Sequence, residues 1–88
     1  MRIAVTRTGG FAGITRQAEL DTTGRPDAAR LRALALGALA DGQSKRPVGV
    51  PDGFTYELTV DGTTAYCADP ELSDAQRELI ASVLGEGA

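Results

Sequence analysis

Apolar and polar side chains alternate along four short stretches of the chain, and a period of two is typical of half-buried β-strands. The alternation is strictest over residues 54–60, where Phe, Tyr, Leu and Val are separated by Thr, Glu and Thr. Residues 63–68 follow directly after Asp61-Gly62, a dipeptide that favours a type I′ hairpin turn. Residues 2–7 and 14–20 alternate more weakly, and Arg16 falls on the apolar face, from which its stem could reach the sheet edge. The pattern therefore predicts two β-hairpins.

Two further stretches repeat their apolar residues at helical spacing. Over residues 27–40, Pro26 precedes a stripe whose members are Leu31, Leu34, Ala35 and Ala38, widened by Leu36 and Leu39. Proline suits the first position of a helix, and Gly42 is a plausible stop. The second helix is predicted from about residue 73 to residue 84. It opens with Ser73 and Gln76, the spacing of a capping box, and residues 85–88 are expected to fray.

The order of elements is thus strand, strand, helix, strand, strand, helix. We expect an α+β fold, in which a four-stranded antiparallel sheet carries both helices on one face. The other face, rich in Thr, Arg, Glu and Gln, would then face water. With 88 residues, the chain is expected to form one domain, residues 1–88.

The connection between the first two strands is rich in glycine. It reads Arg7-Thr8-Gly9-Gly10-Phe11-Ala12-Gly13 and leads into a strand rather than a helix, so it offers no helix end to a phosphate. Its glycines give the backbone access to positive φ. Two interpretations of Phe11 stay open: the ring folds back onto the sheet, or it is an exposed anchor for a partner protein.

Composition excludes several classes of function. The net charge of −3 and the scattered basic residues argue against nucleic acid or an anionic membrane as a partner. No apolar run is long enough to span a membrane, and no secretory signal precedes the first strand. A single cysteine allows no intrachain disulfide, which fits a reducing compartment. We therefore expect a cytoplasmic protein, with export by a route that this chain does not show as the alternative. The absence of histidine removes the commonest general base and metal ligand.

The remaining candidate groups also favour ordinary structural roles. Cys67 lies in a strand pattern without a neighbouring base, so we expect a partly buried apolar side chain rather than a nucleophile. The acidic residues Asp69, Glu71, Asp74 and Glu78 lack the spacing of a calcium loop. We therefore expect neither an enzyme nor a metal site, and no cofactor.

The first strand, the Arg7–Gly13 loop and the chain length together resemble emfourin, a family of small bacterial inhibitors of thermolysin-like zinc metallopeptidases of the protealysin type. The resemblance implies an inhibitor that needs no catalytic group, and we expect it to be a monomer. From the composition of the glycine-rich loop we hypothesise that this loop enters the active-site cleft and that Phe11 occupies the pocket for a large apolar side chain. The protease-binding residues would then be Thr8, Gly9, Gly10, Phe11, Ala12 and Gly13.

A standard-sized interface needs a second contact patch. Candidates outside the loop tip are Arg7, Lys45, Arg46, Asp61 and Gly62. Of these, Lys45 and Arg46 belong to the long connection over residues 41–52. Two alternatives remain open: an interaction domain that binds such peptidases without inhibiting them, and a domain that binds a small ligand on the sheet.

Overall fold

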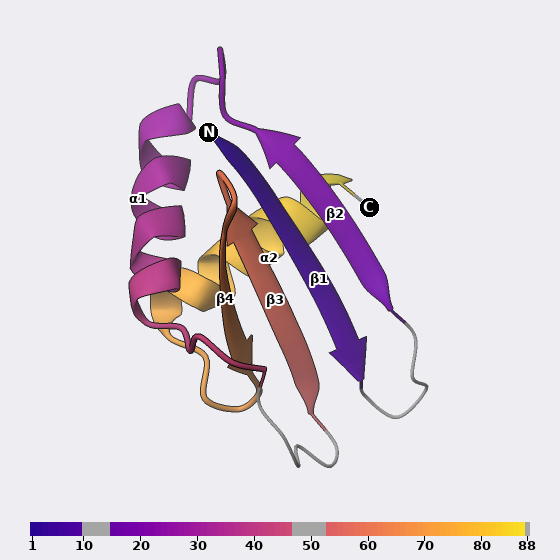
Figure 1. Cartoon of the computed structure of the whole chain (residues 1–88). Helices are drawn as coiled ribbons and strands as arrows, with labels where there is room; N and C mark the ends of the chain where they lie inside the picture. Colours follow the sequence, from indigo (N-terminus) through magenta and orange to yellow (C-terminus); the bar gives the residue numbers. More distant parts are fainter. Residues whose placement is uncertain (10–14, 47–52, 88) are drawn as a thin grey trace.

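The structure is a computed structural model that describes residues 1–9, 15–46 and 53–87, with side chains up to residue 85. Its elements, in chain order, are β1 (Arg2–Gly9), β2 (Arg16–Asp21), α1 (Ala28–Ala40), β3 (Phe54–Val60), β4 (Thr63–Ala68) and α2 (Asp74–Gly87) (Figure 1). They confirm the predicted order, the four-stranded antiparallel sheet and the α+β class.

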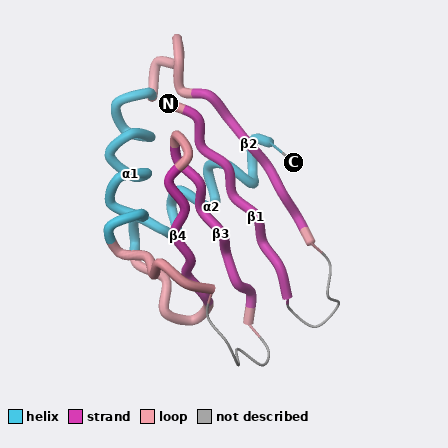
Figure 2. Tube along the Cα trace, viewed as in Figure 1, coloured by secondary structure: helices cyan, strands magenta, loops and turns pink. Residues whose placement is uncertain are grey.

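The strands lie in the order β2-β1-β3-β4, and each neighbouring pair is antiparallel. The central pair, β1 and β3, joins the two hairpins, with α1 connecting edge strand β2 to β3. Because β1 and β3 run in opposite directions, Gly9 lies opposite Phe54 at one end of the sheet, and Ile3 lies opposite Val60 near the other. We call these the loop end and the turn end; the β3–β4 turn belongs to the latter (Figure 2).

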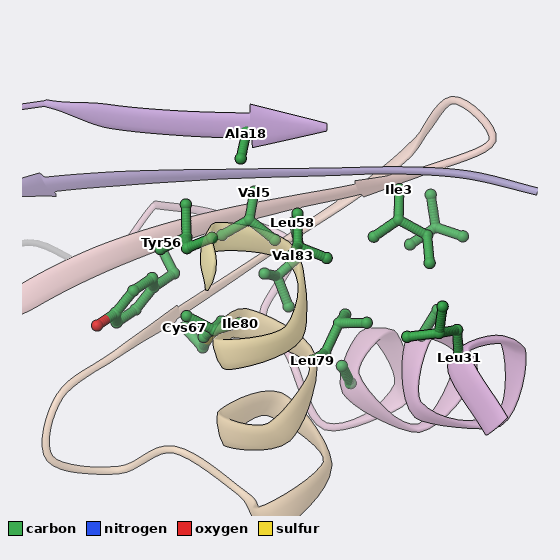
Figure 3. Close-up of a cluster of buried hydrophobic side chains, with 14 residues drawn as sticks. Ile3, Val5, Ala18, Leu31, Tyr56, Leu58, Cys67, Leu79, Ile80 and Val83 are labelled. Carbon is green, nitrogen blue, oxygen red and sulfur yellow. The ribbon is translucent and has the colours of Figure 1, made fainter. Parts of the chain in front are cut away.

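One face of the sheet carries the core. Ile3 and Val5 of β1 lie opposite Val60 and Leu58 of β3, and all four side chains are buried. Both helices cover this face (Figure 3). Their buried apolar residues are Leu31, Ala35 and Ala38 of α1, and Leu79, Ile80, Val83 and Leu84 of α2.

Leu36 departs from the predicted apolar stripe of α1, because its side chain is 56% exposed. At 100° per residue it points about 140° away from Leu31, outside the arc that a packed helix buries. Leu34 and Leu39, at the margins of that arc, are partly buried against the core.

The second helix begins with the predicted capping box. The Ser73 N–H donates to Gln76 Oε1 at 2.9 Å, and the Gln76 N–H donates to Ser73 Oγ at 3.1 Å. Gln76 is nevertheless buried, and its Nε2 donates to the Ala38 carbonyl at 3.2 Å, so one side chain caps α2 and ties it to α1. The helix continues to Gly87, beyond the predicted end at residue 84.

The ends of α1 differ from the prediction. The helix begins at Ala28 with Asp27 as its N-cap residue, so Pro26 lies in the preceding turn; the Asp27 carboxylate pairs with Arg25 instead of capping the helix. At the other end, Gly42 follows the last turn without a positive φ. A Cβ on Gly42 would lie 2.8 Å from Ala65 Cβ, so glycine is required there by close contact with β4.

Candidate partner-binding surface

The candidate surface is the loop end of the sheet, where β1 finishes and where β2 and β3 begin. Among the described residues it comprises Arg7, Gly9, Arg16, Phe54 and Tyr56. Gly10, Phe11, Ala12 and Gly13 lie outside the described residues, so their predicted contact with a peptidase stays a prediction. The described part of the surface consists of the residues that hold both ends of this segment.

Thr8 and Gly9 belong to β1, so their assignment to a loop was wrong. They lie opposite Thr55 and Phe54 of β3, and the Thr8 hydroxyl donates to the Thr55 carbonyl at 3.5 Å. Gly9 has a φ of +91°, and a Cβ there would lie 3.1 Å from the Gly53 carbonyl oxygen. Pairing with β3, a neighbour far away in sequence, therefore extends the strand through a residue type that strands usually avoid.

Arg7 stacks on an aromatic pair at this end. Its guanidinium carbon lies 4.3 Å from the centre of the Phe54 ring, a distance at which a cation is attracted to the ring face. Phe54 meets Tyr56 edge to face, with ring centres 6.4 Å apart. Arg7 Nε is buried and has no hydrogen-bond partner in the described part of the chain.

Burial raises the pKa of the Tyr56 hydroxyl, and the nearby carboxylate of Asp69 raises it further, whereas the guanidinium of Arg7 acts in the opposite direction. Tyr56 therefore stays neutral at physiological pH. Arg7 consequently faces uncharged aromatic groups on this side, and no anion in the described residues balances its charge through an ion pair.

Arg16 lies directly opposite Arg7 in the β1–β2 pair, on the same helix-covered face. The sequence marked it as a cation on an apolar face, and the structure gives the reason. Arg16 Nη2 donates to the Leu84 carbonyl at 3.0 Å. This carbonyl belongs to the last turn of α2, which has no internal partner for its carbonyls and carries a partial negative charge.

Lys45 and Arg46 approach the sheet from the opposite face. The Gln43 and Tyr66 backbones exchange two hydrogen bonds of 2.8 Å, which place the start of the long connection along the outer edge of β4. Arg46 then pairs with Glu57 at 3.3 Å and lies over the Tyr66 ring. Lys45 is exposed. Their role as a second contact patch stays a prediction.

Asp61 and Gly62 form the predicted turn, with φ values of 48° and 87°. They lie at the turn end, separated from Phe54 by the length of β3, about 20 Å at the usual rise per residue. Asp61 Oδ1 accepts the Arg2 N–H at 2.8 Å. These two residues therefore do not continue a surface at the loop end, and any contact they make with a partner stays a separate prediction.

The groups considered for chemistry occupy structural positions. Cys67 is buried in the core cluster, and burial raises the pKa of its thiol to about 11. Asp74 lies in the first turn of α2 and pairs with Arg77 at 3.6 Å. Within the described ranges, no group of three or more acidic or cysteine side chains could hold a metal ion, and no helix is long and apolar enough to cross a membrane.

Comparison with known proteins supplies the family. The family model described as Emfourin matches residues 5–84, which include every strand and helix except the outermost residues of β1 and α2. No curated protein and no solved structure matches the chain. Since the match covers most of the sequence, the chain belongs to the Emfourin family, a family of peptidase inhibitors.

Proposed function

We propose that this protein inhibits thermolysin-like zinc metallopeptidases of the protealysin type, and that it does so by placing residues 8–13 in the active-site cleft. The membership in an inhibitor family supports the general role. The observation that carries the proposed mode of action is the pairing of β1 with both β2 and β3 close to the loop end.

That pairing provides a stiff support on both sides of the glycine-rich segment. Arg7 is paired with Arg16 on one side and with Tyr56 on the other, and Gly9 is still paired with Phe54. A binding segment that starts from fixed strands loses less conformational entropy on binding than a free loop does. Phe11 would then act as the apolar anchor just beyond the scissile-bond position of the cleft.

The proposal involves no chemistry on the inhibitor itself. Cys67 is buried, and the raised pKa of its thiol keeps it protonated near neutral pH. The absence of histidine and of a described metal-ligating cluster favours a steric block over extraction of the zinc. We propose that the peptidase keeps its metal while substrate is excluded.

Titration of thermolysin or a protealysin-type peptidase with the purified protein tests the proposal. We expect stoichiometric loss of activity, competitive with substrate, and an unchanged zinc content of the peptidase. Binding without loss of activity would instead support the non-inhibitory interaction domain, and no binding to any such peptidase would contradict both.

The role of Phe11 needs a matched pair of variants. Phe11→Ala is expected to weaken inhibition by about thirtyfold or more, as for an interface hot spot. Leu36→Ala is the control, because Leu36 is the exposed large apolar side chain on α1, away from the loop end. Equal inhibition by both variants would reject the anchoring role of Phe11 while leaving inhibition itself intact.

A further inference from the structure

The pair formed by Arg7 and Arg16 has no structural explanation as a pair. The two residues lie directly opposite each other in β1 and β2 and on the same face, where side chains of opposed residues start about 5 Å apart. Like charges in that arrangement repel each other. Arg16 donates to the Leu84 carbonyl, whereas the guanidinium of Arg7 lies over the Phe54 ring and near the Tyr56 hydroxyl, and its Nε has no hydrogen-bond partner among the described residues.

Five other arginines of the chain have carboxylate partners, whereas Arg32, exposed on α1, has none among the described residues. The described ion pairs join Arg2 to Glu19, Arg25 and Arg30 to Asp27, Arg46 to Glu57, and Arg77 to Asp74. Among the described residues neither Arg7 nor Arg16 has such a pair, although acidic residues outnumber basic ones in the sequence, 12 to 9. The two arginines thus bring positive charge to the β1–β2 side of the loop end, while Asp69, whose N–H donates to the Phe54 carbonyl, lies on the β3–β4 side.

The surroundings of Arg7 favour a planar anion. The guanidinium of Arg7 lies over the Phe54 ring, which limits its orientation, and the Arg7 side chain is only partly buried. A guanidinium held in this way presents paired donors to a carboxylate, which accepts them side by side.

We propose that Arg7 and Arg16 together bind a carboxylate side chain, an aspartate or a glutamate, on the surface of the inhibited peptidase. The inference rests on the proposed function for the identity of the partner, and it adds Arg16 and a ligand chemistry to the contact surface. A single carboxylate between two guanidiniums would replace their repulsion by attraction. The overall negative charge of the chain disfavours a polyanion such as nucleic acid at the same place.

Inhibition by three variants provides the first test. Arg7→Gln and Arg16→Gln are each expected to weaken inhibition about tenfold to a hundredfold, because the partner carboxylate loses one of its cations. Arg32→Gln is the control: Arg32 is exposed on α1 and belongs to no described ion pair. We also expect added salt to weaken inhibition by the wild type more than inhibition by Arg7→Gln.

If all three variants fold and the two loop-end variants inhibit as strongly as Arg32→Gln, the inference is overturned. The inhibitor function would still stand. Arg7→Lys refines the result, because lysine keeps the charge but loses the planar donor pair. Inhibition restored by lysine would show that charge alone acts and would contradict a paired-donor carboxylate site.

A second measurement does not depend on any peptidase. The arginine Nε–H resonances of the free protein are followed by NMR during titration with acetate and, separately, with chloride. We expect the Arg7 resonance to shift saturably with acetate and not with equal chloride, whereas that of Arg32 does not respond specifically. An unresponsive Arg7 resonance would overturn the carboxylate site. If the wild type binds acetate at Arg7 but inhibits no peptidase, the proposed function is contradicted, whereas the carboxylate site is supported.

One carboxylate of this chain competes as the occupant. Asp52 lies outside the described residues and precedes Phe54 by two positions in the sequence. If Asp52 occupied the pair, Asp52→Asn would move the Arg7 resonance in the free protein and would strengthen its response to acetate. That result would overturn the assignment to a partner, whereas an unchanged Arg7 resonance supports it.

Discussion

The two ends of the sheet satisfy their charges and backbone groups in different ways. At the turn end, the Arg2 and Asp61 residues are joined by two hydrogen bonds, one from each backbone N–H. The Thr22 N–H donates to the Met1 carbonyl, and Asp21 Oδ1 accepts the Thr23 N–H. The Met1 amino group and Arg2 pair with Asp21 and Glu19, so these two cations have partners within the chain.

At the loop end, charges and donors are not all balanced by other described residues. Two arginines lie opposite each other in the β1–β2 register, and a buried guanidinium nitrogen lacks a hydrogen-bond partner among the described residues. Like charges in register and an unpaired buried donor both reduce stability. The contrast supports the proposal that the loop end, rather than the turn end, binds another molecule.

The largest expected effect is a loss of stability, and it should differ between two glycines with positive φ. Gly9→Ala should destabilise the protein by about 2–3 kcal/mol, because the left-handed conformation is combined with a backbone oxygen 3.1 Å from the new Cβ. Gly62→Ala, with φ of +87° but open space around it, should cost about 1–2 kcal/mol. Urea unfolding of both variants measures the difference. Equal losses would show that the loop end is no more constrained than the turn.

Asp61→Ala should lower the free energy of unfolding by about 1 kcal/mol, since the Arg2 N–H loses its acceptor. Inhibition by the folded variant should equal that of the wild type if the turn end lies outside the interface. Chemical denaturation and an inhibition assay on the same sample check both statements. Weaker inhibition would place Asp61 in a second contact patch after all.

Arg7→Gln should have the opposite effect. Removing one of two facing cations is expected to leave stability unchanged or to raise it by about 0.2–1 kcal/mol, in spite of the lost contact with the Phe54 ring. Low salt should enlarge the gain. Unfolding curves at two ionic strengths measure it, and a clear loss of stability at low salt would mean that the arginine pair stabilises the free protein.

The smallest expected effect is a pH dependence at the turn end. The Thr23 backbone N–H, followed by the Thr23 side chain, lowers the pKa of Asp21 from its usual 3.8. A lowered pKa in the folded state stabilises the fold above the unfolded value and loses that contribution as the pH falls through the folded pKa. The difference in stability between wild type and Asp21→Asn should therefore be present at pH 6 and shrink below pH 3.8. A difference that is constant with pH would contradict this cause.

Local patterns in the sequence predicted the elements well. The alternation of Tyr56 and Leu58 with polar residues, the Asp61-Gly62 turn and the Ser73–Gln76 capping box all act over a few residues, and the structure confirms each of them. The prediction that Leu36 belongs to the buried stripe of α1 was wrong, because it ignored the angle between residues on a helix. The resemblance carried by the first strand and loop led to the family that the family model confirms.

The arrangement of the candidate surface depends on contacts between distant parts of the chain. The strand order places β1 against β3, which explains why Thr8 and Gly9 are strand residues and why Arg7 meets Phe54. Arg16 acquires a role only because the C-terminal turn of α2 ends beside β2. No signal within either segment specifies these pairings, so the sequence could mark Arg16 as unusual but could not supply its partner.

Mapping the interface tests the central claim most directly. Backbone amide shifts of the labelled protein are recorded with and without an inactive thermolysin-like peptidase. We predict that the largest changes fall on residues 7–16 and 53–56 at the loop end, with little change at Asp61 and Gly62. Changes centred on the β3–β4 turn, with the loop end unaffected, would contradict the account.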